Sequence, residues 1–107
     1  MPYYTYILRC ADDSLYTGIT TDLRRRFAQH SSGKRAMGAK YTASRPPVGF
    51  ECAFQSDDRA AASRLEYRIK KLTRPQKIAL IGGDAPASLE LEGYIRVDIA
   101  SDGTIKE

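Results

Sequence analysis

The 107-residue chain has no tryptophan, one histidine, two methionines and two cysteines. Two cysteines are too few for the disulfide framework of a small secreted domain, and Cys10 and Cys52 lack metal-ligand spacing. No apolar run approaches the roughly 20 residues of a membrane span. The N-terminus also lacks the charged and apolar segments of a signal peptide. We therefore expect a cytoplasmic protein with two inert buried thiols and no membrane association.

Charge is unevenly distributed along the chain. The net charge is +4, but residues 1–81 carry 15 Lys/Arg against 7 Asp/Glu, whereas residues 82–107 carry 2 against 6. A basic body of this kind is the expected footprint of a polyanionic partner. We assign residues 1–82 to one domain and residues 83–107 to an acidic C-terminal extension, expected as an edge strand or hairpin packed on the same domain.

Alternation of side chains predicts three strands. Residues 3–9 and 15–20 flank the turn-forming sequence 11–14 and predict a hairpin. The third strand is expected over 48–54. Its alternation predicts that four residues share one face, namely Val48, Phe50, Cys52 and Phe54.

Helical periodicity predicts three helices. The first begins near residue 22, capped by Thr20, Thr21 or Asp22, and ends near Gly33. The second follows Asp57 or Asp58 and runs to about residue 72. The third opens with the capping-box pattern of residues 73–76 and is stopped by glycines at 82–83.

The order of elements predicts an α+β fold. It reads β-β-α-β-α-α plus a short C-terminal β segment, which favours a small, mostly antiparallel three-stranded sheet flanked by helices. In the tail, residues 93–99 alternate with Ile95, Val97 and Ile99 inward. This segment is expected to form an edge strand, or a hairpin that meets another copy, so that the protein is a monomer or a weak homodimer.

Three charged or titratable residues suit phosphate chemistry. Arg26 and His30 are four residues apart and share one face of the first helix, where a guanidinium can hold phosphate oxygens and an imidazole can move a proton. Glu66 lies beside the apolar stripe of the second helix, partly buried or directed into a cleft. The alternatives are ordinary: a solvated basic helix, and a surface pair between Glu66 and Lys70.

Residues 33–47 combine positive charge with an aromatic ring and carry no acidic residue. Such a loop can follow a phosphate backbone and stack a base, or it can be a solvated connector. The residues expected to bind nucleic acid are Arg24, Arg25, Lys34, Arg35, Lys40, Tyr41 and Lys70.

Two tyrosine-containing segments, Tyr4-Thr5-Tyr6 and Tyr16-Thr17-Gly18, resemble the halves of the GIY-YIG nuclease motif. Arg26 stands where the family has an arginine on the following helix, and His30 fits members with a histidine one turn later. The segment from Glu66 to Lys70 resembles the context of the family's metal-binding glutamate. The likeness spans about residues 3–82 and is greatest to the small UPF0213 or YhbQ-like subgroup.

The resemblance implies a site in which Tyr6, Tyr16, Arg26, His30 and Glu66 are catalytic. Glu66 would bind a single Mg²⁺ or Mn²⁺, Arg26 would neutralise charge, and Tyr6 or His30 would take the proton of the attacking water. Arg26 is expected to lower the pKa of a Tyr6 base. Gly18 is expected to serve the turn or leave room for substrate. Tyr4 departs from the motif's glycine, and Thr5 and Thr17 replace its isoleucines.

The implied function is an endonuclease that hydrolyses DNA, with RNA also admissible, in DNA repair or in processing branched, nicked or single-stranded DNA. The alternative is a nucleic-acid-binding module of the same fold with little or no turnover. A protein-interaction domain using the tail is a third class. The ordinary alternative for Tyr6 and Tyr16 is a pair of cross-strand core partners.

Overall fold

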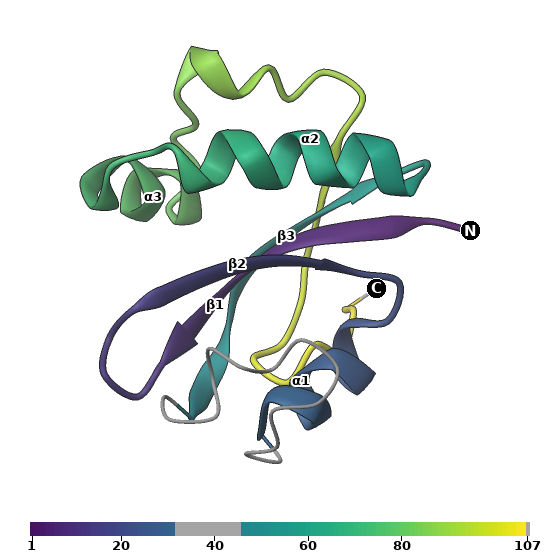
Figure 1. Ribbon diagram of the computed structural model, residues 1–107, viewed down its shortest axis with the longest axis vertical. Helices are drawn as coiled ribbons and strands as arrows, with labels where there is room; N and C mark the ends of the chain where they lie inside the picture. The colour runs from purple at the N-terminus through teal and green to yellow at the C-terminus, as the bar shows by residue number, and fades with distance from the viewer. Residues whose placement is uncertain (32–45, 107) are drawn as a thin grey trace.

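The computed structural model describes residues 1–31 and 46–106, and it confirms an α+β fold (Figure 1). Four antiparallel strands lie in the order β2-β1-β3-β4. The sheet thus has the three expected strands and a fourth from the C-terminal segment. The elements are β1 (Tyr3–Cys10), β2 (Leu15–Thr20), α1 (Leu23–Ser31), β3 (Pro47–Ser56), α2 (Arg59–Lys70), α3 (Arg74–Ile81), the short 3-10 helix η2 (Ala87–Leu89) and β4 (Ile95–Val97).

Strands β1 and β2 form the predicted hairpin. Asp12 closes the turn because its carboxylate accepts a hydrogen bond of 3.0 Å from the Ser14 amide, the local bond that favours Asp in turns. The hairpin register places Tyr6 opposite Gly18 and Leu8 opposite Tyr16. The two tyrosines of the motif therefore lie on one face of neighbouring strands.

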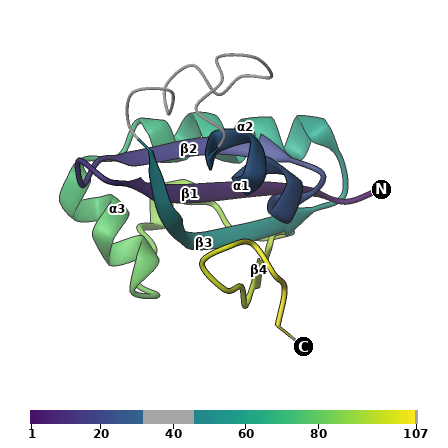
Figure 2. The same ribbon diagram turned by 90° about the horizontal axis from the view of Figure 1, so that it is seen from below.

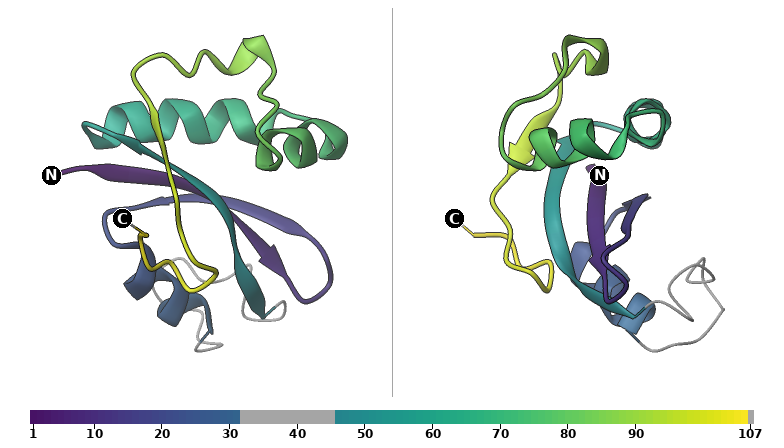
Figure 3. Two further views of the ribbon diagram at one scale, coloured as in Figure 1. Left: turned by 180° about the vertical axis from the view of Figure 1, so that it is seen from behind. Right: turned by 90° about the vertical axis from the view of Figure 1, so that its left-hand side faces the viewer.

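The sheet separates α2 and α3 on one face from α1 on the other (Figures 2 and 3), and each face has its own hydrophobic core. On one face, α2 and α3 pack on residues that include Ile7, Cys52 and Phe54. On the other face, α1 packs on Tyr6 and Leu8. The alternation of β1 is therefore confirmed. Both cysteines are buried, and burial raises the pKa of Cys52 to about 11, as expected of an unreactive thiol.

The predicted face of β3 is wrong because the strand contains a β-bulge. Ile7 pairs with Cys52 but Leu8 pairs with Phe50, so Glu51 is the extra residue. One extra residue reverses the faces of the positions beyond it. Phe50 therefore joins the α1 core, while Cys52 and Phe54 join the α2 core. Val48 is exposed instead of packed.

Local side-chain bonds begin each helix. Asp22 accepts a hydrogen bond from the Arg25 amide and Asp58 from the Ala61 amide, which selects between the alternative caps of α1 and α2. The capping box of α3 is confirmed, with Thr73 as its first residue. The starts of the helices are therefore fixed by residues that the sequence indicates. The predicted end of α1 near Gly33 lies outside the described residues, and α2 ends at Lys70.

The tail from residue 83 crosses the edge of the sheet from the α2 side to the α1 side (Figure 3). Leu89 is buried in the α2 core, whereas Val97 and Ile99 pack against the α1 core. Ile95 shares the face of Val97 but is 63% exposed, so its predicted inward position is wrong. It lies at the end of a three-residue strand, and the packing of this face begins only at Val97.

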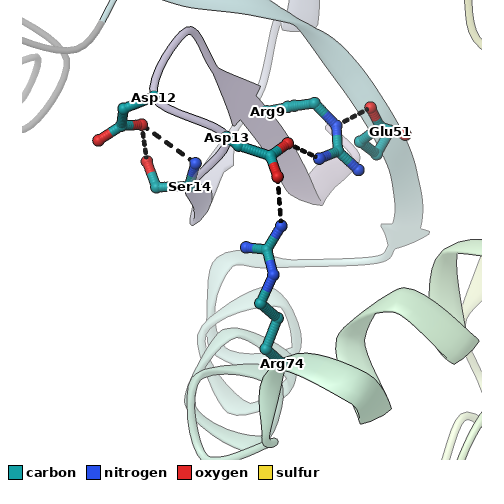
Figure 4. A network of polar contacts seen from close by, with 6 residues as sticks. All are labelled: Arg9, Asp12, Asp13, Ser14, Glu51 and Arg74. Atoms are coloured by element: carbon teal, nitrogen blue, oxygen red, sulfur yellow. Dashed lines mark hydrogen bonds and ion pairs between the residues drawn. The ribbon is translucent and has the colours of Figure 1, made fainter.

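A network of charges joins the bulge to the hairpin turn and to α3 (Figure 4). Arg9 Nε donates to Glu51 at 2.8 Å, and the same guanidinium contacts Asp13. The second oxygen of Asp13 accepts from Arg74 at 3.1 Å. Arg9 and Glu51 are both half-buried, and the network links the bulge residue to the turn.

No helix in the described ranges is both long and apolar enough to cross a membrane.

The tail turn gives a test of how closely it packs on α1. Gly103 has φ +93°, and a Cβ there would lie 2.8 Å from the backbone carbon of Leu23. Gly93 has a similar φ of +88° with no neighbour within 4 Å. Gly93→Ala should therefore lower the free energy of unfolding by about 1–2 kcal/mol, because alanine must adopt the left-handed conformation there. Gly103→Ala should cost a further ~1–3 kcal/mol from the collision, measured by urea unfolding. Equal losses would contradict the contact.

Candidate active site

Tyr6 is the central residue of the site. It lies in the middle of β1 with none of its surface exposed, and its ring packs edge-on against Phe50 at a centroid distance of 5.1 Å. Its hydroxyl lies over Gly18 of β2, where an added Cβ would be 2.5 Å from the oxygen. The absence of a side chain at residue 18 therefore creates the space that the Tyr6 hydroxyl occupies.

Helix α1 supplies two partners for this hydroxyl. Arg26 Nε donates to the Tyr6 oxygen at 3.3 Å, and His30 Nε2 lies 3.0 Å from the same oxygen. The two residues are one helical turn apart, so they reach one atom from the same face. Arg26 also donates to the Gln29 side chain at 3.1 Å, which orients the guanidinium.

Tyr16 completes this side of the site. It is half-buried, and its ring centroid lies 6.4 Å from that of Tyr6 and 5.4 Å from that of His30. The structure thus brings together four of the five residues that the resemblance implies as catalytic. Their contacts go beyond a simple cross-strand tyrosine pair, since α1 reaches the Tyr6 hydroxyl with a cation and an imidazole.

The electrostatics of the cluster depend mainly on burial. Burial raises the pKa of Tyr6 to about 12, although the hydrogen bond and charge of Arg26 act to lower it. Burial, with a smaller repulsion from Arg26, lowers the pKa of His30 to about 4. Arg26 therefore acts to lower the pKa of Tyr6, as predicted, but burial raises it by more. Both residues are neutral at pH 7.

Glu66 approaches from the other layer. It lies on α2, which packs over β1 and over the outer strand β2. Its side chain is 24% exposed, and one of its oxygens lies 3.3 Å from Lys70 Nζ. Its negative charge is the smallest of the influences that raise the pKa of Tyr6. Glu66 therefore acts electrostatically on the cluster while keeping the ordinary i,i+4 pair as well.

The side chains near the cluster determine which metal ion could bind there. In the part of the chain that the structure describes, no three or more His, Cys, Asp or Glu residues gather as a metal site. Glu66 carries the carboxylate whose charge raises the pKa of Tyr6. One carboxylate, completed by water and a substrate phosphate, is a donor set that Mg²⁺ accepts.

The residues expected to bind nucleic acid are partly visible. Arg24 and Arg25 are exposed on α1, and Lys70 is exposed on α2 beside Glu66. The predictions for the basic loop lie outside the described residues, namely Lys34, Arg35, Lys40 and Tyr41.

Two contributors to the site were missed in the sequence. Phe50 packs on the Tyr6 ring only because the bulge turns it to the α1 side, and strand alternation cannot indicate this. Gln29 orients Arg26. Its position three residues after Arg26 was the available signal, because side chains at i and i+3 meet on a helix.

Comparisons with known proteins find one family over most of the chain. The family described as "GIY-YIG catalytic domain" matches residues 2–79. The UPF0213 protein YhbQ of Salmonella typhimurium is 49% identical over 80 residues, 75% of this chain and 77% of that protein. The UPF0213 protein VC_A0739 of Vibrio cholerae is 46% identical over 85 residues, 78% of this chain and 81% of that protein. The solution NMR structure of the UPF0213 protein BH0048 from Bacillus halodurans is 34% identical, with a TM-score of 0.46, and covers 86% of this chain and 96% of that one.

The space above Gly18 predicts the effect of filling it. In Gly18→Ala the new Cβ would lie 2.5 Å from Tyr6 Oη and 2.7 Å from Cζ. Since Tyr6 is enclosed on all sides, we expect a loss of about 1–3 kcal/mol in the free energy of unfolding. Tyr6→Phe in the same chain should recover part of it. Gly82→Ala, whose nearest contact would be 3.5 Å, is the matched control and should stay within about 0.5 kcal/mol.

The lowered pKa of His30 predicts a pH dependence of stability. The unfolded histidine titrates near 6.5 and the folded one near 4, so the unfolded state binds more protons between these values. The contribution of His30 is complete above pH 6.5 and is lost as the pH falls toward 4. We expect a loss of about 2–3 kcal/mol relative to His30→Gln, measured by urea unfolding from pH 7 to pH 4.5. Parallel profiles for the two proteins would show that His30 is not held neutral.

Proposed function

The chain belongs to the GIY-YIG catalytic domain family, a nuclease-type family, and we propose that it is an endonuclease that hydrolyses phosphodiester bonds of DNA with one divalent metal. The observation that supports this best is the chain of contacts from Arg26 through the Tyr6 hydroxyl to His30. A core tyrosine needs one hydrogen-bond partner. A tyrosine hydroxyl held between a fixed cation and an imidazole can transfer a proton next to a bound phosphate.

Substrate recognition would begin with the partly exposed residues. Arg26 and Tyr16 are accessible, whereas Tyr6 and His30 are buried. Arg26 would hold a non-bridging phosphate oxygen and neutralise the charge that grows during attack. Tyr16 would orient the phosphate or the water. Binding of the substrate must also give the attacking water access to the Tyr6 hydroxyl.

The proton path follows from the hydrogen bonds. Arg26 can only donate, so the Tyr6 oxygen accepts from it and the Tyr6 proton is directed to Nε2 of neutral His30. As water attacks phosphorus, its proton would pass to the Tyr6 oxygen while the Tyr6 proton passes to His30. Tyrosine therefore never has to exist as a free phenolate, which its pKa of about 12 disfavours.

The metal would be held by Glu66 on the protein side. When bound, Mg²⁺ or Mn²⁺ would stabilise negative charge on the phosphate and leaving oxygen. Lys70 would have to release the Glu66 oxygen that it pairs with, and it could then contact a substrate phosphate.

The second candidate is a nucleic-acid-binding module with little turnover. One observation favours it: neither possible proton acceptor titrates near neutral pH, which is where general bases work best. The same basic residues would serve both functions, so only turnover and metal dependence separate them. Branched, nicked and single-stranded DNA, as found during repair, are the substrates to compare.

The first experiment is nicking of supercoiled plasmid with Mg²⁺, Mn²⁺ or EDTA. We expect metal-dependent nicking that falls at least about 100-fold in Glu66→Gln and in Tyr6→Phe, because each removes one catalytic contact while keeping the side-chain shape. Glu92→Gln is the matched control, since Glu92 is exposed near the tail and lies outside the site. It should retain full activity.

The outcomes separate the two candidates. Activity that survives Glu66→Gln would refute Glu66 as the metal ligand. Salt-sensitive binding of plasmid, branched and single-stranded DNA without cleavage in any metal would favour the binding module.

A further inference from the structure

Tyr67 is a large aromatic residue on the surface of α2. Its side chain is 61% exposed, whereas Tyr4, Tyr6, Phe50 and Phe54 are buried. Lys71 Nζ lies 4.4 Å from the ring centroid. The ring also lines a shallow apolar hollow together with Ser63, Arg64 and Arg68. A single exposed aromatic ring is common on protein surfaces, so the groups around Tyr67 decide what the ring can bind.

The surroundings of Tyr67 are cationic. Residues 59–71 contain five Lys/Arg and one acidic residue, Glu66. Of the five, Arg68 is paired with Glu90 of the tail at 3.3 Å, and Arg64 shares a hollow with Glu90 and Glu92. Arg64, Tyr67 and Lys71 are spaced i, i+3 and i+7, so they form one line on the outer face of the helix. Arg64, Lys70 and Lys71 are all exposed. An exposed ring with Lys71 over it and Arg64 in the same hollow matches nucleic acid, whose bases stack and whose phosphates are anionic.

This surface continues from the candidate active site. Tyr67 directly follows Glu66, and Lys70, which pairs with Glu66, precedes Lys71. Moving around the helix from Glu66, the exposed positions are therefore Lys70, Tyr67 and then Lys71 with Arg64. A nucleic-acid strand with one phosphate at Glu66 would therefore reach Lys70 first and the Tyr67 ring next.

We propose that the outer face of α2 binds a single strand of nucleic acid, with one unpaired base stacked on Tyr67 and neighbouring phosphates held by Arg64, Lys70 and Lys71. The strand is single because a base within a duplex has no free face to offer the ring. This rests on the proposed function in taking nucleic acid as the substrate. It adds a second contact region beside the cleavage site and a preference for unpaired DNA.

The test is equilibrium binding in EDTA, which requires no metal and no catalysis. The probes are a single-stranded oligonucleotide carrying 2-aminopurine and its blunt duplex. We expect Tyr67→Ala to weaken binding of the single strand about tenfold and to abolish quenching of 2-aminopurine fluorescence, because stacking on the ring is lost. Tyr67→Phe should bind within about twofold of the original chain. Lys71→Ala should lower the salt dependence of binding, whereas Lys106→Ala should not.

Ile95→Ala is the matched control for removing exposed apolar surface, since Ile95 is 63% exposed on β4. It should leave both affinities unchanged. A single-strand affinity that is unchanged in Tyr67→Ala would overturn the proposal and assign this face to another partner. An equal loss for single strand and duplex would overturn the stacking of an unpaired base. If the binding results contradict the proposal but the same variants still nick plasmid, only the proposed α2 surface has failed. If 2-aminopurine is quenched by the original chain but no plasmid is nicked, the α2 surface is supported and the proposed nuclease activity is not.

Discussion

The Tyr6 hydroxyl in the space above Gly18 is the contact on which the rest of the site depends. Burial makes the tyrosine a poor acid and the histidine a poor base, so the two form a hydrogen bond between neutral partners. Arg26 is bound to the same oxygen from the exposed side. A cation, a phenol and an imidazole are thus aligned by one backbone position without a side chain. Few alternative residues could occupy that position, because any Cβ would meet the ring.

The β-bulge at Glu51 has a comparable role in the scaffold. By reversing the faces of β3 it sends Phe50 under the Tyr6 ring and keeps Cys52 and Phe54 under α2. A bulge leaves its extra residue without a regular partner. Here Arg9 binds that residue and Asp13 together, which connects the hairpin turn to the strand that packs against the active site. The network at one end of the sheet therefore supports the packing of the tyrosine at its centre.

Features set by neighbouring residues were predictable from the sequence. The hairpin, the three helices, the cap of α3 and the meeting of Arg26 with His30 on one face all depend on contacts within a few positions. Strand pairing between distant parts of the chain determines the bulge, the position of Phe50 and the exposure of Ile95. The periodicity of the sequence does not indicate these features. The pKa of Tyr6 is a similar case. The cation beside it was visible in the spacing, but the depth of burial that outweighs the cation was not.

The position of Glu66 explains why the site includes the edge of the sheet. Tyr6, Arg26 and His30 belong to the α1 side, and Glu66 belongs to α2 on the opposite side. Strand β2 is the outermost strand between them, so groups from the two layers can meet only near that edge. A substrate that contacts both would cross this edge. The exposed ring and cations that follow Glu66 on this helix lie along that path, which is the physical reason to expect nucleic-acid contact on α2 as well as on α1.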